Sequence, residues 1–224
     1  MDLRRLSAGV ACAFTILGLA AACGQASPAE GDSEEEAYRR KKDSGKPGEI
    51  HLVVTVDWEG RDLTTGNLDA MESLRARFPN LKITQFVNAA YFTKPGANAV
   101  DIQAKMERAL RPADERGLHI HGWKRLFQAA GVTFRATPTF WGGTNQLSND
   151  CAFDCGHEVP ISAYTTSELR KVVKFSLDTL EANGFGRAKS FRAGGWIAKP
   201  NVRDALAAEG IRFENSAVPV VELT

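Results

Sequence analysis

Two short segments carry side chains of the types that bind metal ions and move protons. The first is Asp57-Trp58-Glu59, and the second is His119-Ile120-His121. Because side chains alternate along a strand, the two acidic groups can share one face, and so can the two imidazoles. Two imidazoles and one or two carboxylates make a ligand set for a divalent metal ion, zinc above all. A water bound to such an ion becomes a nucleophile near neutral pH, and a spare carboxylate can act as a general base.

Each pair taken alone has an ordinary explanation. An Asp-x-Glu pair at the end of a strand is usually turn chemistry, and most His-x-His pairs on strands are structural. Their joint occurrence at strand ends within one domain is harder to dismiss, so the sequence predicts a metal site there.

The elements that must position these residues alternate between strand and helix. The hydrophobic pattern predicts six strands. They are 51–57, 82–88, 117–121, 132–135, 189–193 and 211–216. Predicted helices cover 68–78 after an Asn67 cap, 99–110, 123–130, a stretch from the Thr165/Glu168 capping box to Gly184, and 200–209.

This alternation predicts a parallel α/β sheet with right-handed crossovers. An open doubly wound sheet and a βα barrel both fit the order of elements. In both architectures the functional groups gather at the carboxyl ends of the strands. The acidic pair and the histidine pair lie at two such ends.

A long loop rich in Gly, Asn, Asp and Ser is predicted over residues 138–164, and loops of this size are usually functional or disordered. It contains Cys151 and Cys155, which we expect to form a disulfide in an oxidising compartment. A metal site is the alternative, although thiolate zinc sites usually need two such pairs. His157 in the same loop stays open as a third metal ligand, an acid or a plain loop residue.

The amino terminus predicts export. Arg4 and Arg5 precede an uncharged stretch, 6–22, which ends in Ala-Ala-Ala as a cleavable signal does. The run Leu-Ala-Ala-Ala before Cys23 resembles the lipobox of bacterial lipoproteins, with its leucine one place further upstream than in the commonest form. A signal peptide with a chance cysteine and an uncleaved membrane anchor are the alternatives.

The predicted organisation has three parts: a signal peptide over 1–22, a lipidated flexible tether over 23–48 and a globular domain over 49–224. Gly24 follows the cysteine, so in a two-membrane bacterium we expect a lipoprotein on the periplasmic face of the outer membrane or at the cell surface. The anchor would make the membrane one partner.

Charge excludes another class of partner. The chain has 28 Lys and Arg residues against 27 Asp and Glu residues, for a net charge of +1, and loss of the signal leaves the remainder neutral. Nucleic-acid binding leaves a basic footprint, which is absent here.

Six motifs occur in order along the globular part: TVDWEG, FVNAAYF, GLHIHGW, PTFWGG, FRAGGW and NSAVP. Together they resemble a polysaccharide-deacetylase-like domain of the NodB-homology type, over roughly residues 50–219. The resemblance implies a distorted (β/α) barrel, which can be incomplete at the C-terminus here. It also implies metal-dependent removal of acetyl groups from a cell-envelope or extracellular glycan, and some relatives cleave other amide bonds.

The resemblance further implies roles for single residues. Asp57 matches the catalytic base, and Glu59 is the nearest candidate for the acidic metal ligand, although the two roles can be exchanged. His119 matches the first metal histidine. Trp123 stands where the family usually has its second, so His121 must serve instead.

Arg192 matches the arginine that orients the base, and Trp196 matches an aromatic residue on the substrate side. Trp58, Trp123 and Trp141 are further candidates for stacking on sugar rings, with a place in the core as the alternative. The family also has a late catalytic histidine, but no histidine follows His157. The sequence is then a fragment, or the role is absent or filled differently. A non-catalytic glycan-binding lipoprotein and a hydrolase of small amides therefore stay open.

Overall fold

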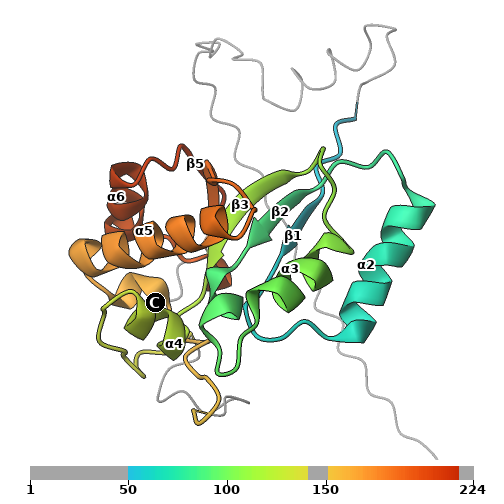
Figure 1. Cartoon of the computed structure of the whole chain (residues 1–224). Helices are drawn as coiled ribbons and strands as arrows, with labels where there is room; N and C mark the ends of the chain where they lie inside the picture. The colour runs from blue at the N-terminus through green and yellow to red at the C-terminus, as the bar shows by residue number, and fades with distance from the viewer. Residues whose placement is uncertain (1–49, 141–150, 217–224) are drawn as a thin grey trace, which may run out of the picture. The chain divides into compact units, whose positions relative to one another are not determined.

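A computed structural model describes residues 50–140 and 151–216 of the chain. Within these ranges five parallel strands form one sheet in the order β1-β2-β3-β4-β5 (Figure 1). The strands are β1 (Thr55–Asp57), β2 (Thr84–Val87), β3 (Glu115–Ile120), β4 (Ser190–Ala193) and β5 (Phe213–Glu214).

The order of the strands bears on the choice between the two predicted architectures. A doubly wound sheet reverses its order partway along, at the point where ligands bind. Here every strand pairs with the next one in the chain. With right-handed crossovers, a sequential order keeps the connecting helices on one face of the sheet, as in a βα barrel. The winding is therefore barrel-like, although no pairing of β1 with β5 closes a barrel in the described ranges.

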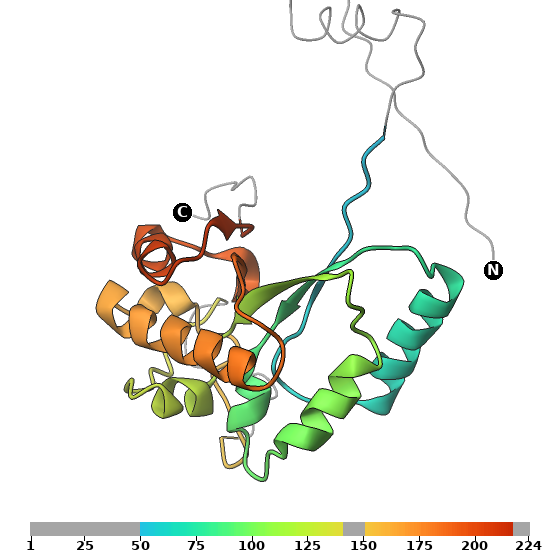
Figure 2. The same cartoon turned by 45° about the horizontal axis from the view of Figure 1, so that its top comes forward.

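Helices connect the strands. They are α2 (Thr65–Arg77), α3 (Ala99–Glu107), α4 (Lys124–Ala129), α5 (Thr166–Ala182) and α6 (Pro200–Ala208), with short 3-10 turns η1 (Ala89–Thr93), η2 (Ile161–Ala163) and η3 (Gly194–Trp196). In Figure 2, α5 and α6 lie side by side, and the two helices pack against each other. Among the described helices, none has the length and apolar character needed to cross a membrane.

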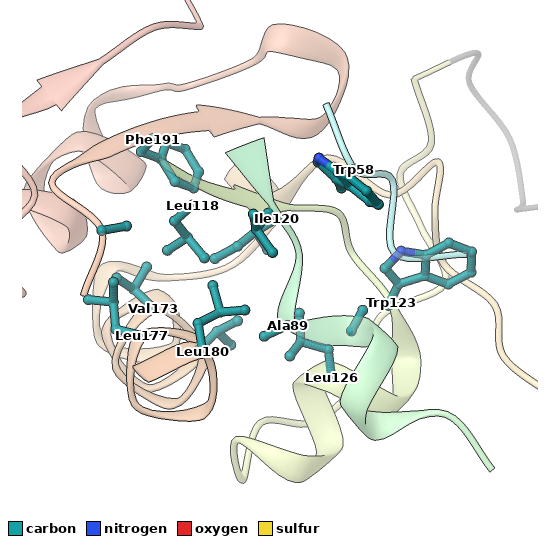
Figure 3. Close-up of a cluster of buried hydrophobic side chains, with 14 of the residues drawn as sticks. Trp58, Ala89, Leu118, Ile120, Trp123, Leu126, Val173, Leu177, Leu180 and Phe191 are labelled. Carbon is teal, nitrogen blue, oxygen red and sulfur yellow. The ribbon is translucent and has the colours of Figure 1, made fainter. Parts of the chain in front are cut away.

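Helix α5 shows how the sequence builds the core. Its predicted capping box is confirmed: Thr165 Oγ1 accepts from the Glu168 amide, and the Glu168 carboxylate accepts from the Thr165 amide. The helix buries one face against the sheet, where Leu118 and Phe191 point toward it (Figure 3). That face consists of Leu169, Val172, Val173, Leu177 and Leu180.

Some predicted elements were wrong. Helix α2 begins at Thr65, because Thr64 and not Asn67 is its N-cap, with Thr64 Oγ1 accepting from the Asn67 amide at 3.4 Å. The strand predicted over 132–135 is absent from the sheet. The amide of Arg135 instead donates to the Tyr164 hydroxyl at 3.0 Å, so a side chain takes the place of a ladder partner. The last predicted strand, 211–216, is reduced to β5.

Candidate metal centre and neighbouring base

The strand register brings the acidic pair and the histidine pair to one edge of the sheet. Asp57 is paired with Phe86, and Phe86 with Gly117. Glu59 and His119 each lie two residues further along, so both come to the same level just beyond the strand ends. The ligand atoms of Glu59, His119 and His121 all lie within 4.8 Å of one another. Oε2 of Glu59 is 2.5 Å from Nε2 of His121 and 3.8 Å from Nε2 of His119.

Hydrogen bonds on the far side of each ring orient these two imidazoles. Nδ1 of His119 is 2.8 Å from the carbonyl oxygen of Arg192, and Nδ1 of His121 is 2.8 Å from the carbonyl oxygen of His157. A carbonyl only accepts, so each Nδ1 carries the proton and donates. In the neutral ring, Nε2 then presents a lone pair toward Glu59. This is the arrangement that protein metal sites use to fix a histidine ligand.

Burial favours the neutral ring at His121. It lowers the pKa of His121 to about 4, although the hydrogen bond to Glu59 acts in the opposite direction. The pKa of Glu59 lies well below its usual range. Burial of that carboxyl group opposes the shift, and the surrounding imidazoles outweigh the effect of burial. Glu59 is therefore a charged carboxylate among three imidazoles, and a charged carboxylate is the form that binds a metal ion.

The environment of His119 also supports a metal site here. Its side chain is 2% exposed, and in the described part of the chain Nε2 is a buried nitrogen without a hydrogen-bond partner. Buried polar atoms are nearly always satisfied, so each exception needs an explanation. A divalent metal ion at Glu59, His119 and His121 would supply one, and the residues present fit such an ion.

A third imidazole joins this group from the predicted long loop. Nε2 of His157 lies 3.0 Å from the same Glu59 Oε2. Its ring stacks on that of His121, with the centroids 3.9 Å apart and the planes at 15°. The sequence singled out His157 but left its role open, because nothing local to a loop predicts which strand end it will reach.

Asp57 lies beside the candidate metal group and outside it. Nη1 of Arg192 donates to Asp57 Oδ1 at 3.0 Å and to Thr55 Oγ1 at 2.9 Å. Nε of Arg192 also donates to the carbonyl of Asn215, and the guanidinium lies over the Phe86 ring. These contacts hold one carboxylate oxygen of Asp57 in a defined position.

Gly194 gives His121 the space it occupies. A Cβ placed on Gly194 would lie 2.3 Å from Nδ1 of His121, closer than real Cβ atoms approach other atoms. The first glycine of the FRAGGW motif is therefore needed for the end of β4 to pack against this imidazole.

The four tryptophans have different environments. Trp58 and Trp123 belong to the core (Figure 3), and their indole nitrogens donate to Gln85 Oε1 and to the carbonyl of Glu59, each at 2.8 Å. Such burial gives no support to a substrate contact by Trp123, whereas Trp58, although 6% exposed, lines a pocket beside the acidic segment. Trp196 is 54% exposed, with a φ of 56° that is uncommon outside glycine. Trp141 and Cys23 lie outside the described residues.

The two cysteines of the predicted long loop are close enough to be bonded. Cys151 and Cys155 form a disulfide.

A pocket of about 250 Å³ adjoins the acidic segment on the side of α2, and apolar side chains make up much of its wall. Among its lining residues are Asp57, Glu59, Leu63, Leu68, Met71 and Tyr91.

Comparison with known proteins gave no matching family model and no similar curated protein. Among solved structures, the chain is similar to a family 4 carbohydrate esterase from Streptomyces lividans in complex with acetate, with a TM-score of 0.41 and 12% sequence identity. The match covers 73% of this chain and 60% of that chain, so this chain spans about three fifths of the esterase's length.

Proposed function

We propose that this chain is a metal-dependent hydrolase that removes acetyl groups from a carbohydrate of the cell envelope or the extracellular space. The observation that carries the proposal is the convergence of three ligand atoms, from Glu59, His119 and His121, within 4.8 Å of one another. Both histidines hold their lone pairs toward that point through hydrogen bonds to backbone carbonyls. Nitrogen and carboxylate ligands of this kind favour zinc.

The chemistry divides among the residues according to their contacts. Glu59, His119 and His121 would hold a divalent ion, which supplies a Lewis acid that lowers the pKa of water and polarises a carbonyl. Asp57 is the general base: it takes a proton from the attacking water through the carboxylate that Arg192 orients. Arg192 acts through Asp57, because its Nη1 is bonded to Asp57 Oδ1 and Thr55 Oγ1.

Trp196 is the tryptophan best placed to meet a sugar. It follows β4 at the same end of the sheet as the candidate metal group, and more than half of its surface is exposed. A large exposed aromatic in an uncommon backbone conformation is a feature of binding sites more often than of stable surfaces. The acetylated glycan is therefore proposed to stack on this ring.

Elemental analysis of the purified full chain, paired with acetate release from a panel of acetylated glycans, tests the proposal. We expect about one zinc ion per chain and release of acetate that a chelator abolishes and added zinc restores. A wild-type chain that binds no metal and releases no acetate would contradict the proposal and favour a glycan-binding protein. A chain that binds metal but cleaves only small amides would support the metal-dependent hydrolysis and contradict the proposed carbohydrate substrate.

A further inference from the structure

We propose that Lys94 and Asp154 are positioning residues for the metal ligands, acting through the loop that carries His157 and through the Trp123 ring. The inference rests on the proposed function, because it takes Glu59, His119 and His121 as ligands. Neither Lys94 nor Asp154 belongs to the motifs that suggested the site.

His157 is the link between this pair and the ligands. Its carbonyl accepts the Nδ1 proton of His121, its ring stacks on that of His121, and its Nε2 contacts Glu59. Displacement of His157 would therefore disturb two ligands at once. Yet His157 lies in a segment with neither helix nor strand, and its side chain is 31% exposed. Contacts of neighbouring loop residues therefore help to set its position.

Asp154 supplies those contacts. Its side chain is fully buried, and Oδ2 lies 2.6 Å from Nζ of Lys94, whose side chain is only 7% exposed. The other oxygen accepts from the amides of Arg125 and Cys155. Lys124 donates its own amide to the Cys155 carbonyl at 2.7 Å. The loop is thereby tied to the start of α4 three residues before His157.

Lys94 also reaches the ligands by a second route. Its Nζ lies 3.4 Å from the centroid of the Trp123 ring, a cation–π contact, and the Trp123 indole donates to the Glu59 carbonyl. One ammonium group thus contacts both the loop that orients His121 and the ring that holds the backbone of Glu59. Burial lowers the pKa of Lys94 to about 8, against the pull of Asp154, so keeping a cation here is costly. A buried ion pair is weak evidence for stability, so we assign Lys94 and Asp154 a role in positioning the residues that they contact.

Metal affinity of the full chain, measured for Zn²⁺ by competition with a chromophoric chelator, tests the inference. We expect Lys94→Met and Asp154→Asn each to weaken Zn²⁺ binding by about 10- to 100-fold, the usual effect of losing a group that orients a ligand. The double variant should be no weaker than the worse single variant, because the pair acts as a unit. With Co²⁺ at saturation, the visible absorption bands should shift in all three, since the ligand geometry changes.

The control is another ion pair of the same chemistry. Lys174 and Asp178 are also 2.6 Å apart, but they are exposed on α5. Lys174→Met combined with Asp178→Asn should keep wild-type Zn²⁺ affinity and the wild-type Co²⁺ spectrum. If a single variant at Lys94 or Asp154 fails to fold, the double variant decides, because it leaves no unpaired buried charge.

The outcomes separate the two proposals. Wild-type affinity and spectrum in folded Lys94 and Asp154 variants would overturn the positioning role and leave the metal site intact. A wild-type chain that binds neither Zn²⁺ nor Co²⁺ would instead overturn the proposed function, and this inference with it.

Discussion

Arg192 donates a hydrogen bond to Asp57 across 135 positions of sequence, with Nη1 and Oδ1 3.0 Å apart. The carbonyl of the same arginine accepts from Nδ1 of His119. One residue of β4 therefore orients both the candidate base, through its side chain, and a candidate metal ligand, through its backbone.

The first prediction separates the base from the ligands. Asp57→Asn should retain metal while the rate of acetate release falls by about 10²- to 10⁴-fold, the usual contribution of a positioned base. Elemental analysis and initial rates measured on the same preparation provide the check. If Asp57→Asn loses its metal while Glu59→Gln keeps it, the two carboxylate roles are reversed.

The second prediction concerns the buried imidazole of His119. His119→Ala should reduce the metal content of the purified chain to a small fraction of the wild-type value, because a tetrahedral site has few ligands to spare. His51→Ala is the matched control, since His51 is an exposed histidine outside the ligand group. Equal metal content in the two variants would show that the metal binds elsewhere.

The third prediction follows from the contact between Gly194 and His121. Gly194→Ala should lower the free energy of unfolding by about 1–3 kcal/mol, as inserted groups in packed sites do, and should weaken Zn²⁺ binding. Gly66→Ala provides a control in α2, where an added Cβ meets nothing within 4 Å. That control should be neutral or more stable by about 0.5–1 kcal/mol, because alanine favours helix over glycine. Urea unfolding with and without zinc measures both, and a harmless Gly194→Ala would contradict the close packing.

The fourth prediction concerns pH and Lys94. The folded pKa of this amine is lowered from 10.5 to about 8, so between these two values the unfolded chain binds more protons than the folded chain. The free energy of unfolding should therefore gain a contribution as pH rises through that window, with a slope of up to about 1.4 kcal/mol per pH unit. Urea unfolding from pH 7.5 to 10.5 in wild type and Lys94→Met isolates it, because the variant lacks the group. Parallel pH profiles in the two proteins would show that folding does not lower the pKa of Lys94.

The fifth prediction concerns the exported form. Cys23 should carry a lipid after cleavage of the preceding residues, because a small-residue run leads directly into it. Incorporation of a labelled fatty acid into the chain expressed in a two-membrane bacterium checks this. Cys23→Ser should show no labelling, and equal labelling of the two would remove the prediction.

Much of the site could be predicted from the sequence because its physical signals are local. Because side chains alternate along a strand, Asp57 and Glu59 were predicted to share one face, and so were His119 and His121. The ends of the two strands were predicted to within a few residues. Capping chemistry at Thr165 and Glu168 is equally local, so the start of α5 was found to the residue. The prediction of a strand over 132–135 was wrong. The composition of these four residues favours a strand, but it does not reveal that the Arg135 amide donates to a side chain and not to a neighbouring strand.

Only the tertiary structure brought His157, Lys94 and Asp154 to the site. These residues lie in a loop and after a 3-10 turn, where no periodicity relates a side chain to a distant strand end. Their meeting depends on how the loop packs against α4 and the Trp123 ring, which is a property of the whole core. The sequence by itself therefore determined which residues of the strand ends can bind a metal, since strand geometry repeats every two residues. The tertiary structure decided which side chains from distant segments orient these candidate ligands. Contacts between distant segments depend on the packing of the whole core and cannot be predicted from a local sequence pattern.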